Sequence, residues 1–433
     1  MKPCVRPPAA LTRKGELYNF ITESSPREEG QRLSHDPLSL DFVPVAEASI
    51  DEADVEAVVE VLRSKRLALG PKKARLEERL KELTGRRYAL ACSSGTAALH
   101  MSLLALGTSE GDVVITTPFS FVASANAVLY CRAVPLFVDV DADTLMPSAD
   151  SLRAAVEMVR SGKARAGRLE IPARNPKGML LVDVFGFSFD WDSLGWAREE
   201  GLFLLEDACE AMGSDCRGRP CGSFGEVSVF GFYPNKQVTA GEGGAVLTDD
   251  PRVWRTCESL SNQGRGEGGE WLYYERLGYN YRMDEMSAAL LLSQLSRIET
   301  IVKRRREAYA RYTSLLSDSS FEGVKTLRVP EWQGSFSPFV FVVLLPEGID
   351  RDATIRIMRE MGVETRPYFH PPIHLQPFYR ELFGYEEGSF PTTESISRRA
   401  LALPFFTDIS QVQQEMVVDR LNKALAKLGH TTR

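Results

Sequence analysis

The sequence predicts an α/β fold, with a large domain built on a mostly parallel central sheet between helices and a smaller C-terminal α+β domain. From about residue 87, short apolar runs alternate with segments of helical periodicity. Continuous apolar runs of four to six residues are typical of strands buried on both faces of a parallel sheet. A long helical pattern after Met286 then leads into a different arrangement. We expect residues 1–42 to be a flexible extension, 43–300 the large domain and 301–433 the small one.

The predicted elements follow this plan in order. Two amphipathic helices come first, one after Asp51 and one over Ala74–Leu83. Helices over Ala97–Leu106 and Ser151–Val159 separate some of the strands that follow. The basic stretch 160–177 reads as an exposed insertion, although an approach to a phosphorylated substrate is a second interpretation. The expected strands are 88–91, 113–115, 136–140, 179–184, 202–205, 227–232 and 245–248.

Composition excludes several classes of protein. The net charge of -7 gives no general attraction to nucleic acid or to an anionic membrane. No run approaches the roughly 18 apolar residues of a membrane span, and the N-terminus lacks the apolar core of a signal peptide. Seven cysteines are an odd set, and the pair Cys216 and Cys221 lacks further ligands nearby. We therefore expect a cytoplasmic protein without a disulfide framework, a metal site, or nucleic-acid and membrane partners.

Chemistry in such a sheet gathers where strands end, and four of these places carry suitable residues. Ser94, Gly95 and Thr96 follow the first strand and open a helix, which leaves N–H and O–H donors for a phosphate. By themselves they are more often a simple helix cap. After the second strand comes Phe121, which could stack on a planar ring, although a core position is the default for phenylalanine.

The other two places carry charge. Glu206 and Asp207 end an apolar strand, and a buried carboxylate needs a cation or donors; a protonated pyridine nitrogen would serve. Lys236 follows another strand and precedes the glycines of Gly241–Gly244. A partly buried lysine beside a cationic ring suits Schiff-base chemistry, because its neutral form is favoured there. A surface lysine and a capping aspartate are the plain alternatives.

Together these places carry a resemblance to one family. From about Phe42 to the C-terminus the chain resembles the DegT/StrS nucleotide-sugar aminotransferases, which are pyridoxal-phosphate enzymes of fold type I, like aspartate aminotransferase. The matching segments are Ser94-Gly95-Thr96-Ala97-Ala98-Leu99, Glu206-Asp207-Ala208-Cys209-Glu210-Ala211, Phe232-Tyr233-Pro234-Asn235-Lys236, Gly241-Glu242-Gly243-Gly244, Gly278-Tyr279-Asn280-Tyr281-Arg282-Met283 and Arg366-Pro367-Tyr368. Jointly they are far more specific than any one of them.

The resemblance implies a cofactor, pyridoxal 5'-phosphate, that passes through pyridoxamine 5'-phosphate, and a homodimer with shared active sites. The implied roles are phosphate binding by Ser94, Gly95 and Thr96, ring stacking by Phe121, a bond from Asp207 to the ring nitrogen, Glu210 near the ring hydroxyl, Schiff-base formation and proton transfer by Lys236, and a contact of Asn280 with the neighbouring subunit's phosphate site. One position departs from the pattern. Gly231 stands where the family commonly has a serine on the phosphate, and Ser228 lies too far back to replace it.

The implied reaction moves an amino group from glutamate to a keto sugar of a nucleotide-linked sugar, in amino-sugar or polysaccharide biosynthesis. A donor carboxylate requires an arginine, for which Arg282 and Arg366 are the candidates. His374 could line the sugar pocket and is equally well a structural residue. Three alternatives remain open: a keto-inositol or other carbocycle of antibiotic biosynthesis as the acceptor, a dehydratase, which Lys236 disfavours, and a non-catalytic regulatory or binding protein of the same fold.

Overall fold

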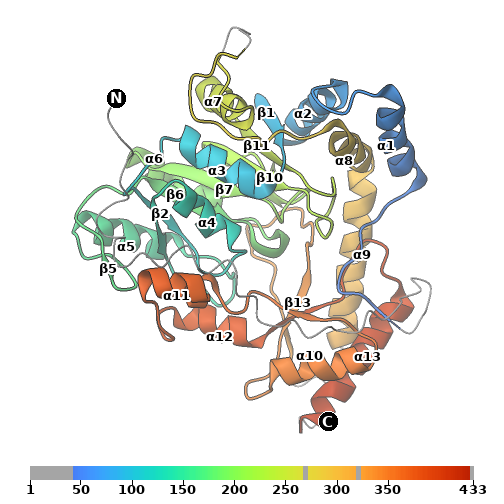
Figure 1. Cartoon of the computed structure of the whole chain (residues 1–433). Helices are drawn as coiled ribbons and strands as arrows, with labels where there is room; N and C mark the ends of the chain where they lie inside the picture. Colours follow the sequence, from blue (N-terminus) through green and yellow to red (C-terminus); the bar gives the residue numbers. More distant parts are fainter. Residues whose placement is uncertain (1–41, 267–271, 318–322, 430–433) are drawn as a thin grey trace, which may run out of the picture. The chain divides into compact units, whose positions relative to one another are not determined.

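A seven-stranded sheet organises the chain in the computed structural model, which describes residues 42–266, 272–317 and 323–429 (Figure 1). The strand order is β1–β11–β10–β7–β6–β2–β3. Strand β11 runs antiparallel to both of its neighbours, and the other four pairings are parallel. The strands are β1 Tyr88–Cys92, β2 Val113–Thr116, β3 Val134–Phe137, β6 Gly178–Val182, β7 Phe203–Asp207, β10 Val227–Gly231 and β11 Gly244–Thr248. The predicted mostly parallel α/β sheet is confirmed.

The predicted and observed strands differ most at β3 and β6. The apolar run that predicted a strand over 136–140 continues past the end of β3, because Val138 and Val140 stay buried after the chain leaves the sheet. Similarly, Val184 belongs to a short 3-10 turn, η1 Val184–Gly186, and not to β6. Apolar runs therefore locate the strands, and hydrogen bonding to the neighbours decides where they end.

Helices cover the sheet on both faces, as the alternation of side chains in a strand requires. In β1, Leu90 and Cys92 join one hydrophobic cluster, whereas Ala89 and Ala91 join another. The first cluster includes residues of α3, α4, α5 and α7, and the second includes residues of α2, α8 and α9. The bounds are α1 Glu52–Ser64, α2 Pro71–Thr84, α3 Gly95–Ala105, α4 Ala123–Tyr130, α5 Ala149–Arg160, α6 Gly195–Glu199, α7 Pro251–Ser261 and α8 Glu285–Ser296, with the 3-10 turn η2 Trp191–Leu194.

A second, antiparallel sheet has the order β12–β13–β15–β14. The elements after residue 317 are β12 Lys325–Thr326, β13 Phe341–Leu344, β14 Arg366–Pro367, β15 Ala400–Leu403, α10 Arg351–Glu360, α11 Pro377–Phe383, α12 Pro391–Arg399 and α13 Gln411–Lys427, with the turn η3 Ile373–Leu375. Helix α9 Ile298–Ser317 runs from α8 toward α10 and α13 (Figure 1). Ile301 packs in a cluster of the large sheet, and Tyr312 packs with β13 and β15. The domain boundary predicted near residue 300 falls at the start of this shared helix and stays a prediction.

The structure describes the predicted insertion 160–177 but almost none of the predicted extension 1–42. The extension 1–42 lies, except for Phe42, outside the described residues. The basic stretch 160–177 contains a small hairpin, β4 Arg165–Ala166 and β5 Leu169–Glu170. Two of its arginines pair with distant carboxylates, with N–O distances of 2.8 Å for Arg160 and Glu200 and 2.7 Å for Arg168 and Glu386. A second hairpin is formed by β8 Asp215–Cys216 and β9 Arg219–Pro220. Within the described residues no helix is long and apolar enough to cross a membrane.

Candidate active site

Two adjacent acids at the end of β7 serve different purposes, because consecutive side chains of a strand point to opposite faces. Glu206 is fully buried, and its two carboxylate oxygens accept hydrogen bonds from the backbone N–H groups of Gly222 (2.7 Å) and Phe224 (2.8 Å). Burial raises the pKa of Glu206. Glu206 therefore stabilises the loop that contains Gly222 and Phe224.

Asp207 faces the other way and is 4% exposed. Its Oδ2 accepts a hydrogen bond from the Ser124 hydroxyl at 2.8 Å, and its Oδ1 accepts one from the backbone N–H of Cys209 at 3.2 Å. Both oxygens are therefore held, while a carboxylate keeps further lone pairs for a ligand. The sequence indicated an acid at this strand end, and the structure separates the ligand-binding candidate from its structural neighbour.

Lys236 lies in the turn between β10 and β11, the order that the sequence predicted. Its Nζ is 3.3 Å from Glu210 Oε1 and 4.0 Å from the centre of the Phe339 ring, and its side chain is 15% exposed. The turn is fixed by backbone hydrogen bonds, including Phe232 N–H to Gly243 O at 2.9 Å. Gly241 adopts a φ of 78°, a conformation that favours glycine. The amine is thus held at a defined place on the sheet edge.

Glu210 contacts both the Lys236 amine and buried backbone groups. Its Oε2 accepts a hydrogen bond from the backbone N–H of Phe185 at 2.9 Å. The Gln237 side chain donates to the Glu210 carbonyl at 2.6 Å and to the Ser337 carbonyl at 3.0 Å. Burial raises the pKa of Glu210, although the neighbouring Lys236 opposes the shift. The structure therefore brings Asp207, Glu210 and Lys236 to one region.

The start of α3 packs against the same region. The Ser94 hydroxyl accepts a hydrogen bond from Ala97 N–H at 3.1 Å, so it caps the helix, and Thr96 is half-buried in the first turn. A Cβ atom on Gly95 would lie 2.9 Å from Cys209 Sγ and 3.2 Å from Gly231 Cα. This close approach requires glycine and brings the helix N-terminus next to the segment that carries Asp207.

The same packing accounts for Gly231. A Cβ atom there would lie 3.2 Å from Cys209 Sγ, so a larger residue would press on that thiol. Ser228 offers no substitute hydroxyl, because it donates to Phe224 O at 2.7 Å and accepts from Arg86 at 2.9 Å. Hydroxyls of Ser93, Ser94 and Thr96 belong to the segment that opens this helix.

Phe121 and Asn280 occupy open positions. Phe121 lies two residues before α4 and is 62% exposed, in contrast to the fully buried Phe119. Asn280 is exposed, and its backbone forms an isolated bridge with Asn262. Both side chains are available for contacts with a ring or with another subunit, and the roles expected of them stay predictions.

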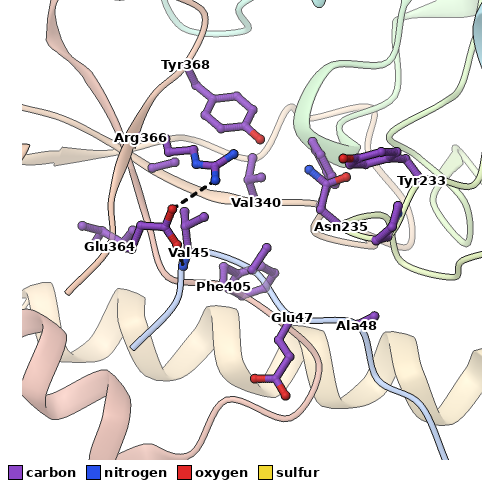
Figure 2. Close-up of a pocket in the computed structure, with 15 residues that line it drawn as sticks. Val45, Glu47, Ala48, Tyr233, Asn235, Val340, Glu364, Arg366, Tyr368 and Phe405 are labelled. Atoms are coloured by element: carbon purple, nitrogen blue, oxygen red, sulfur yellow. Dashed lines mark hydrogen bonds and ion pairs between the residues drawn. The ribbon is translucent and has the colours of Figure 1, made fainter. Parts of the chain in front are cut away.

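The two arginine candidates lie in different surroundings. Arg282 donates to the side-chain oxygens of Asn262 (2.9 Å) and Gln263 (2.6 Å). Arg366, at the start of β14, pairs with Glu364 at 3.0 Å and is 61% exposed. Figure 2 shows Arg366 with Tyr368 on one side of a pocket and Tyr233 and Asn235 on the other. Arg366 is therefore the arginine that shares a pocket with the lysine turn.

This pocket has a volume of about 200 Å³. Its wall includes Phe339, whose ring also contacts Lys236, and the segment Val45–Ala48. His374 lies elsewhere: it is fully buried, with Nε2 3.1 Å from Glu394 Oε1 and its ring against Phe390. Burial lowers the pKa of His374. Neither His374 nor Arg282 lines the pocket, so the structure gives His374 a structural contact and separates Arg282 from Arg366.

Sequence reasoning missed two contributors. Ser124 could have been noticed as a hydroxyl in the first turn of the helix that follows the second strand. Phe339 had no such signal, because it approaches Lys236 only through the packing of the small sheet against the lysine turn.

The donor set suits pyridoxal phosphate. An amine for a covalent bond to an aldehyde, a buried carboxylate for a ring nitrogen and a helix N-terminus for a phosphate lie around the ends of β7, β10 and β1. The contact between Gly95 and Gly231 places that helix start beside the strand that precedes Lys236. These residue types and their placement fit the cofactor that the resemblance implies.

Known proteins of the same architecture cover most of the chain. A "Pleiotropic regulatory protein" of Geobacillus stearothermophilus is 32% identical over 84% of this chain and 91% of its own length. The structure of DesI in the presence of its TDP-sugar product matches with a TM-score of 0.78 and 31% identity, over 90% of this chain and 94% of that one. An aminotransferase from Brucella abortus matches with a TM-score of 0.76 and 30% identity, over 86% and 95% of the two chains.

The family model named "DegT/DnrJ/EryC1/StrS aminotransferase family" matches residues 48–422. This range contains both sheets and every candidate residue discussed above. The chain therefore belongs to the DegT/DnrJ/EryC1/StrS family and is a pyridoxal-phosphate-dependent aminotransferase of fold type I.

Proposed function

We propose that this aminotransferase moves an amino group from glutamate to a keto sugar carried on a nucleotide, in amino-sugar or polysaccharide biosynthesis. The observation that carries the proposal is the Lys236 amine beside Glu210, because Asn235, which precedes Lys236, lines a pocket together with Arg366. The 31% identity to DesI, whose structure was determined with a TDP-sugar product, supports the class of acceptor.

Lys236 has the central role in this proposal. Its Nζ would hold the cofactor covalently, and the freed amine would move a proton at the reacting carbon, first as a base and then as an acid. When bound, the cofactor supplies an electron sink for the carbanion. The Phe339 ring at 4.0 Å and the Glu210 carboxylate at 3.3 Å restrict where the amine can lie. Positioning of this kind is a large part of catalysis.

Asp207 holds the protonated ring nitrogen. A carboxylate fixed by two donors in a buried site needs little rearrangement when charge develops next to it. The start of α3, with Ser94, Gly95 and Thr96, would bind the phosphate, and Phe121 and Glu210 would help to hold the ring.

Arg366 receives the donor carboxylate. Because its guanidinium is largely exposed and has Glu364 at 3.0 Å, an incoming carboxylate can exchange with that partner. The pocket of about 200 Å³ is smaller than the roughly 300–1,000 Å³ of pockets that enclose drug-sized ligands. We therefore place the amino acid and the keto sugar in turn in this pocket, and the nucleotide outside it.

The active unit in this proposal is a homodimer, with Asn280 directed to the partner subunit's phosphate site. Next to Asn280, the side chain of Leu277 is 85% exposed, and Leu272, Tyr273 and Tyr274 are also exposed. A cluster of exposed large apolar residues is typical of a protein interface. Co-expression of Lys236→Ala and Asn280→Ala subunits tests the sharing, because mixed dimers would contain one intact site. Activity no higher than that of either variant alone contradicts a shared site.

One assay tests the function directly. The purified holoenzyme is incubated with glutamate and a panel of keto-sugar nucleotides, with a keto-inositol as the carbocyclic alternative, and 2-oxoglutarate is measured. We expect glutamate alone to bleach the yellow absorbance and a keto-sugar nucleotide to sustain turnover. Turnover with the keto-inositol alone assigns the carbocyclic acceptor instead.

The relative from Geobacillus, named as a pleiotropic regulatory protein, favours a regulatory role as the second candidate. Protein that binds sugar nucleotides, keeps its colour in glutamate and forms no 2-oxoglutarate supports that role and contradicts the enzymatic proposal.

A further inference from the structure

Two buried serines connect helix α4 and the turn before it to the carboxylate of Asp207. Ser124, in the first turn of α4, is 1% exposed, and its Oγ lies 2.8 Å from Asp207 Oδ2. The same Oγ lies 3.1 Å from the Oγ of Ser120, which is also buried. We propose that Ser124 is a positioning residue for Asp207 and that Ser120 fixes the direction of its hydroxyl. The inference rests on the proposed role of Asp207 at the ring nitrogen.

The direction of the two hydrogen bonds follows from the groups involved. An ionised carboxylate can only accept, so the Ser124 proton must point to Asp207. The Ser124 oxygen is then left as the acceptor, and Ser120 must donate to it. A hydroxyl that accepts one hydrogen bond is a stronger donor in the next. The pair therefore forms a one-way relay from Ser120 through Ser124 to Asp207.

The relay defines the orientation of the carboxylate before any ligand arrives. Ser124 holds Oδ2, and the backbone N–H of Cys209 holds Oδ1 at 3.2 Å. With one donor on each oxygen, rotation of the carboxylate about its bond to Cβ would break both contacts. The lone pairs that stay free then point in a fixed direction, which is what a ring N–H needs.

Loss of the Ser124 hydroxyl should shift the position of the proton that Asp207 and the ring nitrogen share. A donor stabilises the negative charge of the carboxylate. Without it, a larger share of that proton moves to the carboxylate oxygen, and the ring nitrogen becomes less protonated. Because a less protonated ring accepts electrons less readily, we expect Ser124→Ala to lower kcat roughly tenfold.

The test uses holoenzyme loaded with cofactor labelled with ¹⁵N in the ring, and its NMR signal reports protonation without turnover. We expect Ser124→Ala to move the signal toward that of unprotonated pyridine, and Ser124→Thr, which keeps a hydroxyl, to restore it. Asp207→Asn gives the largest change expected in the position of the NMR signal. Ser102→Ala is the matched control, because Ser102 is a buried helical serine whose hydroxyl donates to Ala98 O at 2.7 Å.

The outcomes distinguish the positioning role of Ser124 from the role of Asp207 at the ring nitrogen. If Asp207→Asn moves the signal and Ser124→Ala does not, the positioning role is overturned and the role of Asp207 survives. If neither variant moves it, the role of Asp207 fails and the inference fails with it. Should Ser124→Ala not fold or not bind cofactor, Ser120→Ala decides: a smaller shift in the same direction supports the relay, and an unchanged signal overturns it.

Discussion

The polar residues at the ends of β7 and β10 differ from those of the small sheet in how they are held. Asp207 and Lys236 are mostly buried and have partners contributed by other elements, such as Ser124 and Phe339. After residue 317, Arg366 is largely exposed and pairs with Glu364, two residues away, whereas His374 is buried against Glu394. In our proposal the chemistry therefore takes place at the edge of the large sheet, where partners from other elements hold the side chains, whereas Arg366 supplies an exposed binding group and His374 a structural contact.

The largest expected effect lies at Asp207. We expect Asp207→Ala to lower kcat by about 10²–10³-fold, because a preorganised charge at the reacting system is lost. Steady-state kinetics of the cofactor-loaded variant give this value.

Glu206→Gln is the matched control, because Glu206 is the adjacent acid on the opposite face of the same strand. It should reduce the free energy of unfolding and leave the kcat of the folded, loaded enzyme close to that of the original chain. An equal loss of kcat in the two variants would remove the distinction between these acids.

Arg366→Ala tests whether the exposed arginine binds the donor carboxylate. We expect the KM for glutamate to rise about 10–100-fold, which corresponds to a lost hydrogen bond between charged groups. The value of kcat should fall less. Arg282→Ala should raise that KM less, because Asn262 and Gln263 already occupy its guanidinium. The reverse order would assign the donor carboxylate to Arg282.

For His374→Ala we expect a loss of about 1–3 kcal/mol in the free energy of unfolding, because a buried hydrogen bond and ring contacts disappear. Denaturant unfolding of the variant measures this loss. The KM for the acceptor should stay unchanged. Unchanged stability with a raised acceptor KM would instead place His374 in the sugar site.

The smallest effect concerns Glu210 and depends on pH. Burial raises its pKa above the usual 4.5, although Lys236 opposes the shift. A raised pKa in the folded state means that the stability contributed by protonated Glu210 is present below about pH 4.5 and is lost as pH rises through the raised value. In cofactor-free protein, the Tm of Glu210→Gln relative to the original chain should therefore increase from about pH 4.5 to pH 8.

Glu394→Gln provides a control of opposite sign. Burial would raise the pKa of Glu394, but hydrogen bonds from the backbone N–H groups of Gly388 and Phe390 and from His374 outweigh it and lower the pKa. The stability from ionised Glu394 is present at higher pH and is lost as pH falls through the lowered value. The Tm of Glu394→Gln should therefore approach that of the original chain on acidification. If the Tm difference from the original chain changed with pH in the same way for both variants, the opposite pKa shifts of Glu210 and Glu394 would be contradicted.

The comparison between the two regions also explains what the sequence could predict. Asp207 ends an apolar run and Lys236 lies in the turn after the next one, so the strand ends alone placed both residues at the sheet edge. The bond between Ser124 and Asp207 joins residues 83 positions apart, and the Phe339 ring, just before β13, lies over the Lys236 amine, 103 positions earlier in the chain. Such contacts depend on how helices and sheets pack, which local pattern does not encode. His374 shows the converse, because nothing in its sequence neighbourhood revealed that Glu394 would bury it.

The covalent attachment of the cofactor tests the central claim most directly. Holoenzyme is reduced with borohydride, which makes the bond between the cofactor and its lysine permanent, and the labelled peptide is identified by mass spectrometry. We expect the label on Lys236, and no label in Lys236→Ala even though that variant still binds the cofactor noncovalently. A label on any other residue, or none in protein that has bound the cofactor, would contradict the assignment of Lys236.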